Sequence, residues 1–388
     1  MLAESDVVAR RRASRRELAC DPERQRAVQS GALWAIERAR YFDGDHRAWR
    51  EADIEICSGE IVGIHGSGTS CADIKYDASG LLCLPGLVSA SLNGDHAGGD
   101  WFSAAEQALA AGFTTVGKFS SDLDNDRQAA RECGIRSVLY YVLADRWLGL
   151  SPGPPIMSTD ACVHRYRQAL RSLSARRISV MPAIGSQFAA SPALIVALHE
   201  MATHEGRRLA IRVDGGGEHA SEFNDAYGCS SVSLLFSLRV LDQHLLAFPI
   251  TSINRFDWRL MQRSACKIVA CVAGSRNQVD RRTISAFDLD GIAAFLEGAG
   301  DDPRYRSEDF VDALTWKGAK ALTVDNVGKI AIGQRADLLL YDNPTLMASQ
   351  PHQSASDLFI QCVTRHRPLT IFVDGQSVTG KRCGATRN

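Results

Sequence analysis

The middle of the chain alternates short apolar runs with segments of helical periodicity. The apolar runs cover residues 81–91, 112–119, 135–143, 178–185, 208–214, 245–250, 267–272 and 283–288. Helix-like segments follow several of them; after residues 178–185, Ser191 suits a helix N-cap and Pro192 the first helical position. Strands that are repeatedly followed by helices favour parallel pairing, and eight such units predict a closed (β/α)8 barrel of the TIM type in an α/β protein. A doubly wound open sheet is the alternative, because periodicity alone does not show closure.

The two ends of the chain have a different, strand-like texture. Residues 31–80 alternate apolar and polar positions and are punctuated by glycines. Residues 336–342 and 369–380 look similar, and an Asp-Gly pair in the latter segment suits a tight hairpin. We therefore predict three parts, which are an N-terminal extension over 1–30, a small β-sandwich domain built from 31–80 plus 330–388, and a barrel domain over 81–329.

Composition narrows the class of protein. Of the 388 residues, 45% are hydrophobic and 23% are charged, as in soluble globular proteins. The formal net charge of −1 provides no overall field that would attract nucleic acid or an anionic membrane. The sequence has no long apolar span and no secretory core, and its eleven cysteines include no Cys-x-x-Cys pair. We therefore expect a cytoplasmic protein with reduced thiols, whose partner is a small molecule and which could form a homo-oligomer.

Four sequence stretches, taken in order, carry a resemblance to a known family. They are "LPGLVSASLN" (84–93), "ALAAGFTTVGKF" (108–119), the segment from Ser186 to Asp214, and "VGKIAIGQRADLLLYD" (327–342) with the terminal Val-Asp-Gly at 373–375. In this order and spacing the chain resembles the amidohydrolase superfamily, on the branch of the cytosine deaminases and chlorohydrolases. The resemblance implies a metal-bearing barrel beside a β-sandwich built from both chain ends. It also implies hydrolysis of C–N bonds by metal-activated water.

The resemblance further implies where the metal ligands would fall, and most of those positions hold other residues. The histidine pair of strand one falls on Ser91 and Asn93. The histidine of strand five falls on Arg212, and the glutamate that follows it falls on Gly215. The histidine of strand six falls on Phe248, and a further histidine falls at or near Ala270. The strand-eight aspartate alone has a candidate, Asp290, with Asp288 as the alternate.

These replacements bear directly on metal binding. Serine and asparagine oxygens are weak neutral ligands for zinc or iron. Arg212 would place a fixed positive charge where a dication sits, and Phe248 offers no donor atom. We therefore predict that the usual metal centre is absent and that no cofactor is bound. Asp95 and His96, just past the first strand, are either rescuing ligands or part of a solvated loop.

In such a barrel the strand ends converge on one pocket. The candidate catalytic residues there are Asp290, Arg212 and Lys118. The candidate substrate-binding residues are Ser91, Asn93, His96, Gln187, Asp214 and Ser252. Arg212 could bind a carboxylate or phosphate through two parallel hydrogen bonds, and Asp290 could act as a base or neutralise Arg212. Lys118 is either an activated amine or a salt-bridged side chain, and Cys271 is either a nucleophile or, as its surroundings favour, a buried structural thiol.

Three functions are compatible with this pattern. The first is a metal-independent enzyme that acts on a small polar or anionic metabolite in the barrel mouth. The second is a catalytically silent homologue, a pseudoenzyme, that binds a ligand or supports a partner subunit. The third is a C–N bond hydrolase or deaminase with unconventional metal ligands. We further expect the guanidinium of Arg212 to point into the mouth and to pair there with Asp290 or with an anionic ligand.

Overall fold

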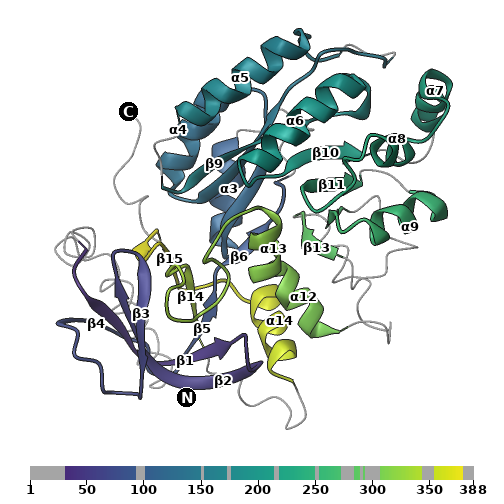
Figure 1. Cartoon of the computed structure of the whole chain (residues 1–388). Coiled ribbons are helices and arrows are strands. Elements are labelled where there is room, and N and C mark those ends of the chain that lie inside the picture. The colour runs from purple at the N-terminus through teal and green to yellow at the C-terminus, as the bar shows by residue number, and fades with distance from the viewer. Residues whose placement is uncertain are drawn as a thin grey trace.

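The structure is a computed structural model, and two eight-stranded sheets organise it (Figure 1). It describes residues 31–92, 101–149, 153–172, 176–213, 218–249, 253–271, 284–288, 292, 306–342 and 354–378. One sheet contains the strands from the middle of the chain, and the other joins strands from both chain ends. None of the helices in these ranges is long and apolar enough to cross a membrane.

The first sheet is the predicted barrel. Its strands, all paired in parallel, are β6 (Leu87–Ser89), β7 (Phe113–Ser120), β8 (Arg136–Val142), β9 (Ile178–Ile184), β10 (Leu209–Val213), β11 (Leu245–Pro249), β12 (Lys267–Ala270) and β13 (Ile284–Phe287). The amide of Ala90, just after β6, donates a hydrogen bond of 2.7 Å to the carbonyl of Phe287 on β13. The first and last strands therefore meet, and the sheet is a nearly closed TIM-like barrel. The predicted fold class is confirmed, and each of the eight predicted strand segments overlaps one of these strands.

Helices cover the outside of the barrel (Figure 1). They are α3 (Trp101–Ala110), α4 (Leu123–Cys133), α5 (Thr159–Arg171), α6 (Pro192–His204), α7 (Glu218–Tyr227), α8 (Ser231–Ser237), α9 (Arg255–Arg263), α12 (Ser307–Leu314) and α13 (Trp316–Ala321). The last helix, α14 (Ala355–Arg365), packs instead against α12 and the second sheet. Ser191 caps α6 as predicted, because its side chain accepts a hydrogen bond from the amide of Leu194, and Pro192 opens the helix. Such caps satisfy amides that the first helical turn leaves without partners.

Alternation along the strands separates an inner from an outer face. On β8 the side chains of Val138 and Tyr140 belong to the cluster inside the barrel, whereas Leu139 belongs to the layer between barrel and helices. On β11 Phe248 points inward, while Ala247 points outward. The inner cluster is apolar and closely filled, as expected for a small parallel barrel.

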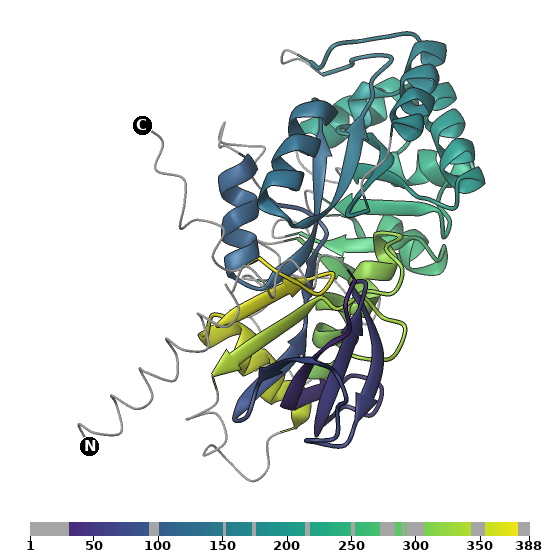
Figure 2. The same ribbon diagram turned by 90° about the vertical axis from the view of Figure 1, so that its left-hand side faces the viewer.

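The second sheet joins the two chain ends, as predicted (Figure 2). Its strands are β1 (Trp34–Asp43), β2 (Ala48–Cys57), β3 (Glu60–His65), β4 (Ile74–Asp77), β5 (Leu81–Pro85), β14 (Leu338–Asp342), β15 (Thr370–Val373) and β16 (Gln376–Ser377). It is a mixed sheet, since β1 pairs antiparallel with β2 but parallel with β4 and β5. The predicted barrel strand over 81–91 divides at Gly86, so that residues 81–85 pair with β14 and only the remainder enters the barrel. The predicted extension over 1–30 lies outside the described residues.

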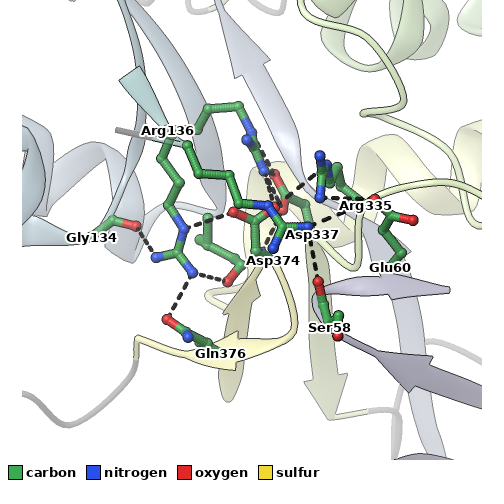
Figure 3. Close-up of polar contacts among 11 residues, drawn as sticks. Ser58, Glu60, Gly134, Arg136, Arg335, Asp337, Asp374 and Gln376 are labelled. Atoms are coloured by element: carbon green, nitrogen blue, oxygen red, sulfur yellow. Dashed lines mark hydrogen bonds and ion pairs between the residues drawn. The ribbon is translucent and has the colours of Figure 1, made fainter. Parts of the chain in front are cut away.

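Buried charges hold the barrel against this second sheet (Figure 3). Arg136, at the start of β8, lies 2.6 Å from a carboxylate oxygen of Asp374 and 3.1 Å from one of Asp337. Arg177 approaches the other oxygen of Asp374 at 2.9 Å. Burial alone would raise the pKa of Asp374, but the two arginines outweigh it and hold that pKa below its ordinary value. We call these four residues, Arg136, Arg177, Asp337 and Asp374, the junction cluster.

Candidate functional site

Arg212 lies at the inner side of the barrel near the carboxyl end of β10. It is two positions from Ala210, which belongs to the inner cluster, and its guanidinium carbon is 4.2 Å from the ring centre of Phe119 on β7. A guanidinium over an aromatic face is attracted by the electrons of the ring, and its N–H groups point outward in the guanidinium plane. The sequence anticipated this direction. Its proposed partner, Asp290, falls outside the described residues, so their pairing stays a prediction.

Three aromatic rings fill the barrel interior beneath Arg212. The ring centres of Phe119, Tyr140 and Phe248 are 5.0 to 5.4 Å apart, and each pair meets edge to face. All three side chains are buried. Aromatic pairs in this geometry stabilise a core beyond the area that they bury. We call these residues the interior cluster.

The hydroxyl of Tyr140 is satisfied inside the barrel. It donates a hydrogen bond of 2.7 Å to the carbonyl oxygen of Ala90, just beyond β6. Burial raises the pKa of Tyr140 well above its ordinary value, so the phenol keeps its proton. A side chain at Gly117 would not fit here, since its Cβ would meet the Ala90 oxygen at 2.1 Å and the Tyr140 hydroxyl at 2.2 Å. The glycine in "TTVGKF" therefore makes room for Tyr140 to reach strand β6.

Lys118 lies on the outer side of the barrel. Its neighbour Phe119 points into the barrel, so Lys118 points outward between β7 and the helices. Its ammonium lies 2.6 Å from a carboxylate oxygen of Asp126 on α4 and 5.3 Å from the ring centre of Trp101 on α3. The lysine is thus an ion-paired side chain of the outer layer, which is the salt-bridged alternative that the sequence left open.

The carboxylate nearest to the end of β13 in the described residues is Asp288. It follows Phe287 directly and lies two positions after Ala286, whose side chain faces the barrel interior. Its amide donates to the carbonyl of Ala270 at 3.2 Å, and its side chain is buried. Continuing the strand alternation by one step turns Asp288 inward. Asp288, the alternate choice of the sequence, is therefore placed to face the mouth, whereas Asp290 lies outside the described residues.

The remaining sequence-predicted residues divide into two groups. Gln187 is buried in the short 3₁₀ helix η1 (Gln187–Ala189) after β9, and Ser91 is buried after β6, where its carbonyl accepts a hydrogen bond from Ser89. Cys271 is buried at the end of β12 with the inner cluster, as expected for a structural thiol. Four candidates besides Asp290 lie outside the described residues, namely Asn93, His96, Asp214 and Ser252.

Comparison with known proteins places this scaffold in a family. The model of the amidohydrolase family matches residues 92–378, which is well over half of the chain. The chain belongs to the amidohydrolase family.

Curated relatives of this amidohydrolase are similar at low identity. The 5-methylthioadenosine/S-adenosylhomocysteine deaminase 1 of Syntrophus aciditrophicus (strain SB) is 23% identical over 309 residues, covering 72% of this chain and 68% of the relative. A 5-methylthioadenosine/S-adenosylhomocysteine deaminase of Desulforudis audaxviator (strain MP104C) is 22% identical over 392 residues, covering 84% and 89%. The sequence relatives of this amidohydrolase are therefore deaminases, which hydrolyse C–N bonds.

Solved structures share the fold. Atrazine chlorohydrolase from Arthrobacter aurescens TC1, complexed with zinc, superposes with a TM-score of 0.72 at 15% identity, covering 89% of this chain and 94% of the other. An adenosine deaminase from Xanthomonas campestris with bound zinc gives a TM-score of 0.72 at 17% identity, covering 89% and 92%. At such identities the likeness shows the architecture alone.

The described residues of this amidohydrolase do not fit a zinc ion at the positions that the resemblance assigns. Phe248 holds its place in the interior cluster by ring contacts, and Arg212 brings a permanent positive charge over Phe119. Within the described ranges, no three histidine, cysteine or acidic side chains gather closely enough to hold a metal ion. A hydrocarbon ring and a guanidinium cannot replace imidazole ligands. Phe248 and Arg212 therefore supply no donor atom for a zinc ion at these positions.

Sequence reasoning missed Tyr140 and Phe119 as residues that shape the mouth. The signal was present, because both are large aromatic residues near the carboxyl ends of predicted strands. Their inward direction depends on strand phase, which the structure supplies. The same reasoning also passed over Arg146 and Trp147, which follow β8 at the same end of the barrel.

Proposed function

We propose that this protein is a C–N bond hydrolase or deaminase that acts on a small polar molecule in the barrel mouth. The observation that carries the proposal is the guanidinium of Arg212, held over Phe119 at the inner side of the carboxyl ends of the strands. In barrel enzymes this end holds the active site. Family membership and the deaminase relatives support the reaction class.

Arg212 is the proposed substrate-binding cation. The ring of Phe119 supports the flat guanidinium, so its N–H groups can donate to a carbonyl, carboxylate or phosphate group of a substrate. Its charge also stabilises negative charge that develops when water adds to a carbon–nitrogen centre. Arg212 therefore serves binding and electrostatic stabilisation, not proton transfer.

Asp288 is the proposed proton carrier. Hydrolysis of a C–N bond requires a group that takes a proton from the attacking water and a group that gives a proton to the leaving nitrogen. One carboxylate can perform both steps in turn. Asp288 is the described acidic residue that strand alternation turns toward the interior. A metal, if one takes part through unconventional donors, would lower the pKa of the attacking water.

A second candidate function rests on the interior cluster. Phe119, Tyr140 and Phe248 occupy the barrel interior with rings that supply no metal ligand. This arrangement favours a metal-independent member of the family, which either catalyses without a metal or binds a ligand without turnover.

Ammonia release tests the main proposal. Purified protein would be incubated with 5-methylthioadenosine, S-adenosylhomocysteine and a panel of amino-substituted heterocycles, and its metal content would be measured in the same preparation. We expect release with at least one substrate, and loss of turnover in both Asp288→Asn and Arg212→Gln. An Arg131→Gln variant, altered at an exposed position on α4, is the matched control and should behave as the parent protein.

The outcomes separate the two candidates. Turnover that survives removal of all transition metal supports the metal-independent form, whereas turnover that follows metal content supports unconventional ligands. If no substrate of the panel is hydrolysed but ligands raise the melting temperature in an Arg212-dependent way, the protein binds without catalysis. Wild-type turnover in the Asp288→Asn variant would overturn the role given to that carboxylate.

A further inference from the structure

Loops after three successive barrel strands bring a row of aromatic side chains together. Trp147 follows β8, Phe188 lies in η1 after β9, and Phe223 and Tyr227 lie on α7 after β10. Neighbouring ring centres along this row are 6.4, 5.7 and 4.6 Å apart. We call these four residues the aromatic row. Because it is built from loops at the carboxyl ends of the strands, it lies on the face where barrel proteins bind their ligands.

The four rings are not equally exposed. Phe188 and Phe223 are buried in the middle of the row, with only 5% and 2% of their surfaces accessible. Trp147 and Tyr227, at the two ends, are half-buried and keep part of their surface open. Phe188 and Phe223 therefore pack behind Trp147 and Tyr227, whose accessible parts present flat apolar surface.

A cation is attached to the same row. The guanidinium of Arg146 donates a hydrogen bond of 3.0 Å to the hydroxyl of Tyr227, and its carbon lies 5.7 Å from the centre of that ring. Across the ranges that the structure describes, Arg146 forms no ion pair with a carboxylate. Since a guanidinium carries five N–H donors, most of them can reach an acceptor on a ligand.

The loop that carries Arg146 and Trp147 is held firmly in place. The carboxylate of Asp145 accepts hydrogen bonds from the amide and the hydroxyl of Ser191, at 2.6 and 2.5 Å, and from the hydroxyl of Thr159 at 2.7 Å. These bonds tie the loop to the first turns of α5 and α6. Little conformational freedom is then lost when a ligand binds, which favours affinity.

Backbone contacts add to this fixation. The amide of Leu148 donates to the carbonyl of Phe188 at 3.1 Å. Gly149 and Gly153 lie so close to the indole of Trp147 that a Cβ at either position would come within 2.5 Å of the ring. The chain therefore folds closely around one part of the indole, and glycine is required at both places.

We propose that the aromatic row and Arg146 form a binding site for a flat aromatic or heteroaromatic ring that carries a carboxylate. The ring would lie against Trp147 and Tyr227, and the carboxylate would accept hydrogen bonds from Arg146. This inference rests on the proposed function in one respect, since it names the substrate class for the same barrel mouth. The site itself is a matter of binding and can be tested without turnover.

Calorimetric titration with three simple probes tests the site. Benzoate carries both an aromatic ring and a carboxylate charge. Benzamide keeps the ring without the charge, and cyclohexanecarboxylate keeps the charge without the aromatic ring. We expect benzoate to bind about tenfold more tightly than either of the other two, because a charged hydrogen bond and ring stacking each contribute on this scale.

Two variants assign the contributions to residues. Arg146→Gln keeps a polar side chain but loses the charge, and should weaken benzoate binding about tenfold while leaving benzamide unchanged. Trp147→Leu should weaken both ring-bearing probes. The matched controls are Arg131→Gln, at an exposed position on α4, and Trp316→Leu on α13, where the tryptophan lies beside the ammonium groups of Lys317 and Lys329. Both controls should bind as the parent protein does.

The result can separate this inference from the proposed function. If ammonia release fails but the probe series behaves as described, the site stands and the reaction does not. If ammonia release succeeds while Arg146→Gln and Trp147→Leu leave probe binding and KM unchanged, the site is overturned and the reaction stands. Equal binding of benzoate and benzamide by the parent protein would also overturn it, because it would show that no charge is recognised.

Discussion

Replacing Arg136 by methionine tests how the barrel is fastened to the sheet of the chain ends. In the junction cluster its guanidinium lies between Asp337 and Asp374, and all three side chains are at least nine-tenths buried (Figure 3). Methionine keeps much of the volume but removes the positive charge. Two buried carboxylates then lose their main partner, although Arg177 still contacts Asp374.

The expected loss of stability is large. Removing one partner of a buried ion pair costs about 3–5 kcal/mol, because the remaining charge stays desolvated. A surface pair provides the scale for comparison. Arg38 and Asp77 lie 3.3 Å apart with about half of each side chain exposed, so Arg38→Met should cost at most about 1 kcal/mol. Urea unfolding of both variants measures the two differences.

The loss should also depend on pH in a defined direction. In the parent protein the pKa of Asp374 is lowered, so its contribution to stability is present above the unfolded pKa and is lost as the pH falls through the folded value. Without Arg136, burial, which is the largest single influence on Asp374, raises the folded pKa of this carboxyl above its unfolded value. Protonation then favours the folded variant, and its deficit relative to the parent should shrink between about pH 7 and pH 5. A deficit below about 1 kcal/mol, or one that stays constant over this range, would refute the reasoning.

Three further predictions concern the barrel itself. In thermal melting, Gly117→Ala should destabilise the protein by about 1–3 kcal/mol, because the new Cβ would collide with the hydroxyl of Tyr140. The control variant Gly44→Ala should be tolerated, because its Cβ would meet no atom closer than 3.8 Å. Lys118→Met should lower the melting temperature, because it breaks a buried ion pair, and should leave the kcat of the folded protein unchanged. A loss of kcat would show that Lys118 takes part in the reaction. The double variant Phe248→His with Arg212→His should bind more zinc than the parent protein under equilibrium dialysis, and equal zinc in both would show that these two positions do not decide metal binding.

Much of the fold could be predicted because hydrophobic pattern reports burial directly. The eight apolar runs of the middle segment each overlap one of the eight barrel strands, and the strand-like ends meet in one sheet. The run over 81–91 was misjudged because it is continuously apolar. Only the structure shows that it turns at Gly86, where a Cβ would meet the side chain of Thr114 at 2.1 Å. Apolar pattern cannot show which of two sheets a buried strand joins.

The candidate site was less predictable, because it depends on strand phase. A shift in register between β6 and β7 occurs at Leu87 and Val88, so inward positions on β7 cannot be counted from the sequence. That Phe119 points inward and Lys118 outward was therefore open until the structure showed it. Arg212 was anticipated correctly because β10 pairs with β11 without a register shift and alternates regularly.

Phe248 and Arg212, at positions where the resemblance implies histidines, are linked physically. A histidine at 248 would bring a polar nitrogen into a closely packed interior, where it would need a partner. Phenylalanine instead completes the contacts with Phe119 and Tyr140 and keeps the interior apolar. An apolar interior strengthens the attraction between the Phe119 ring and a guanidinium, because little water competes for the charge. Phe248 thus favours a guanidinium over the Phe119 ring, and Arg212 presents a positive charge at the inner side of the strand ends. With Arg146 at the same end of the barrel, the selection would run toward anionic ligands, which is the property that the benzoate series measures.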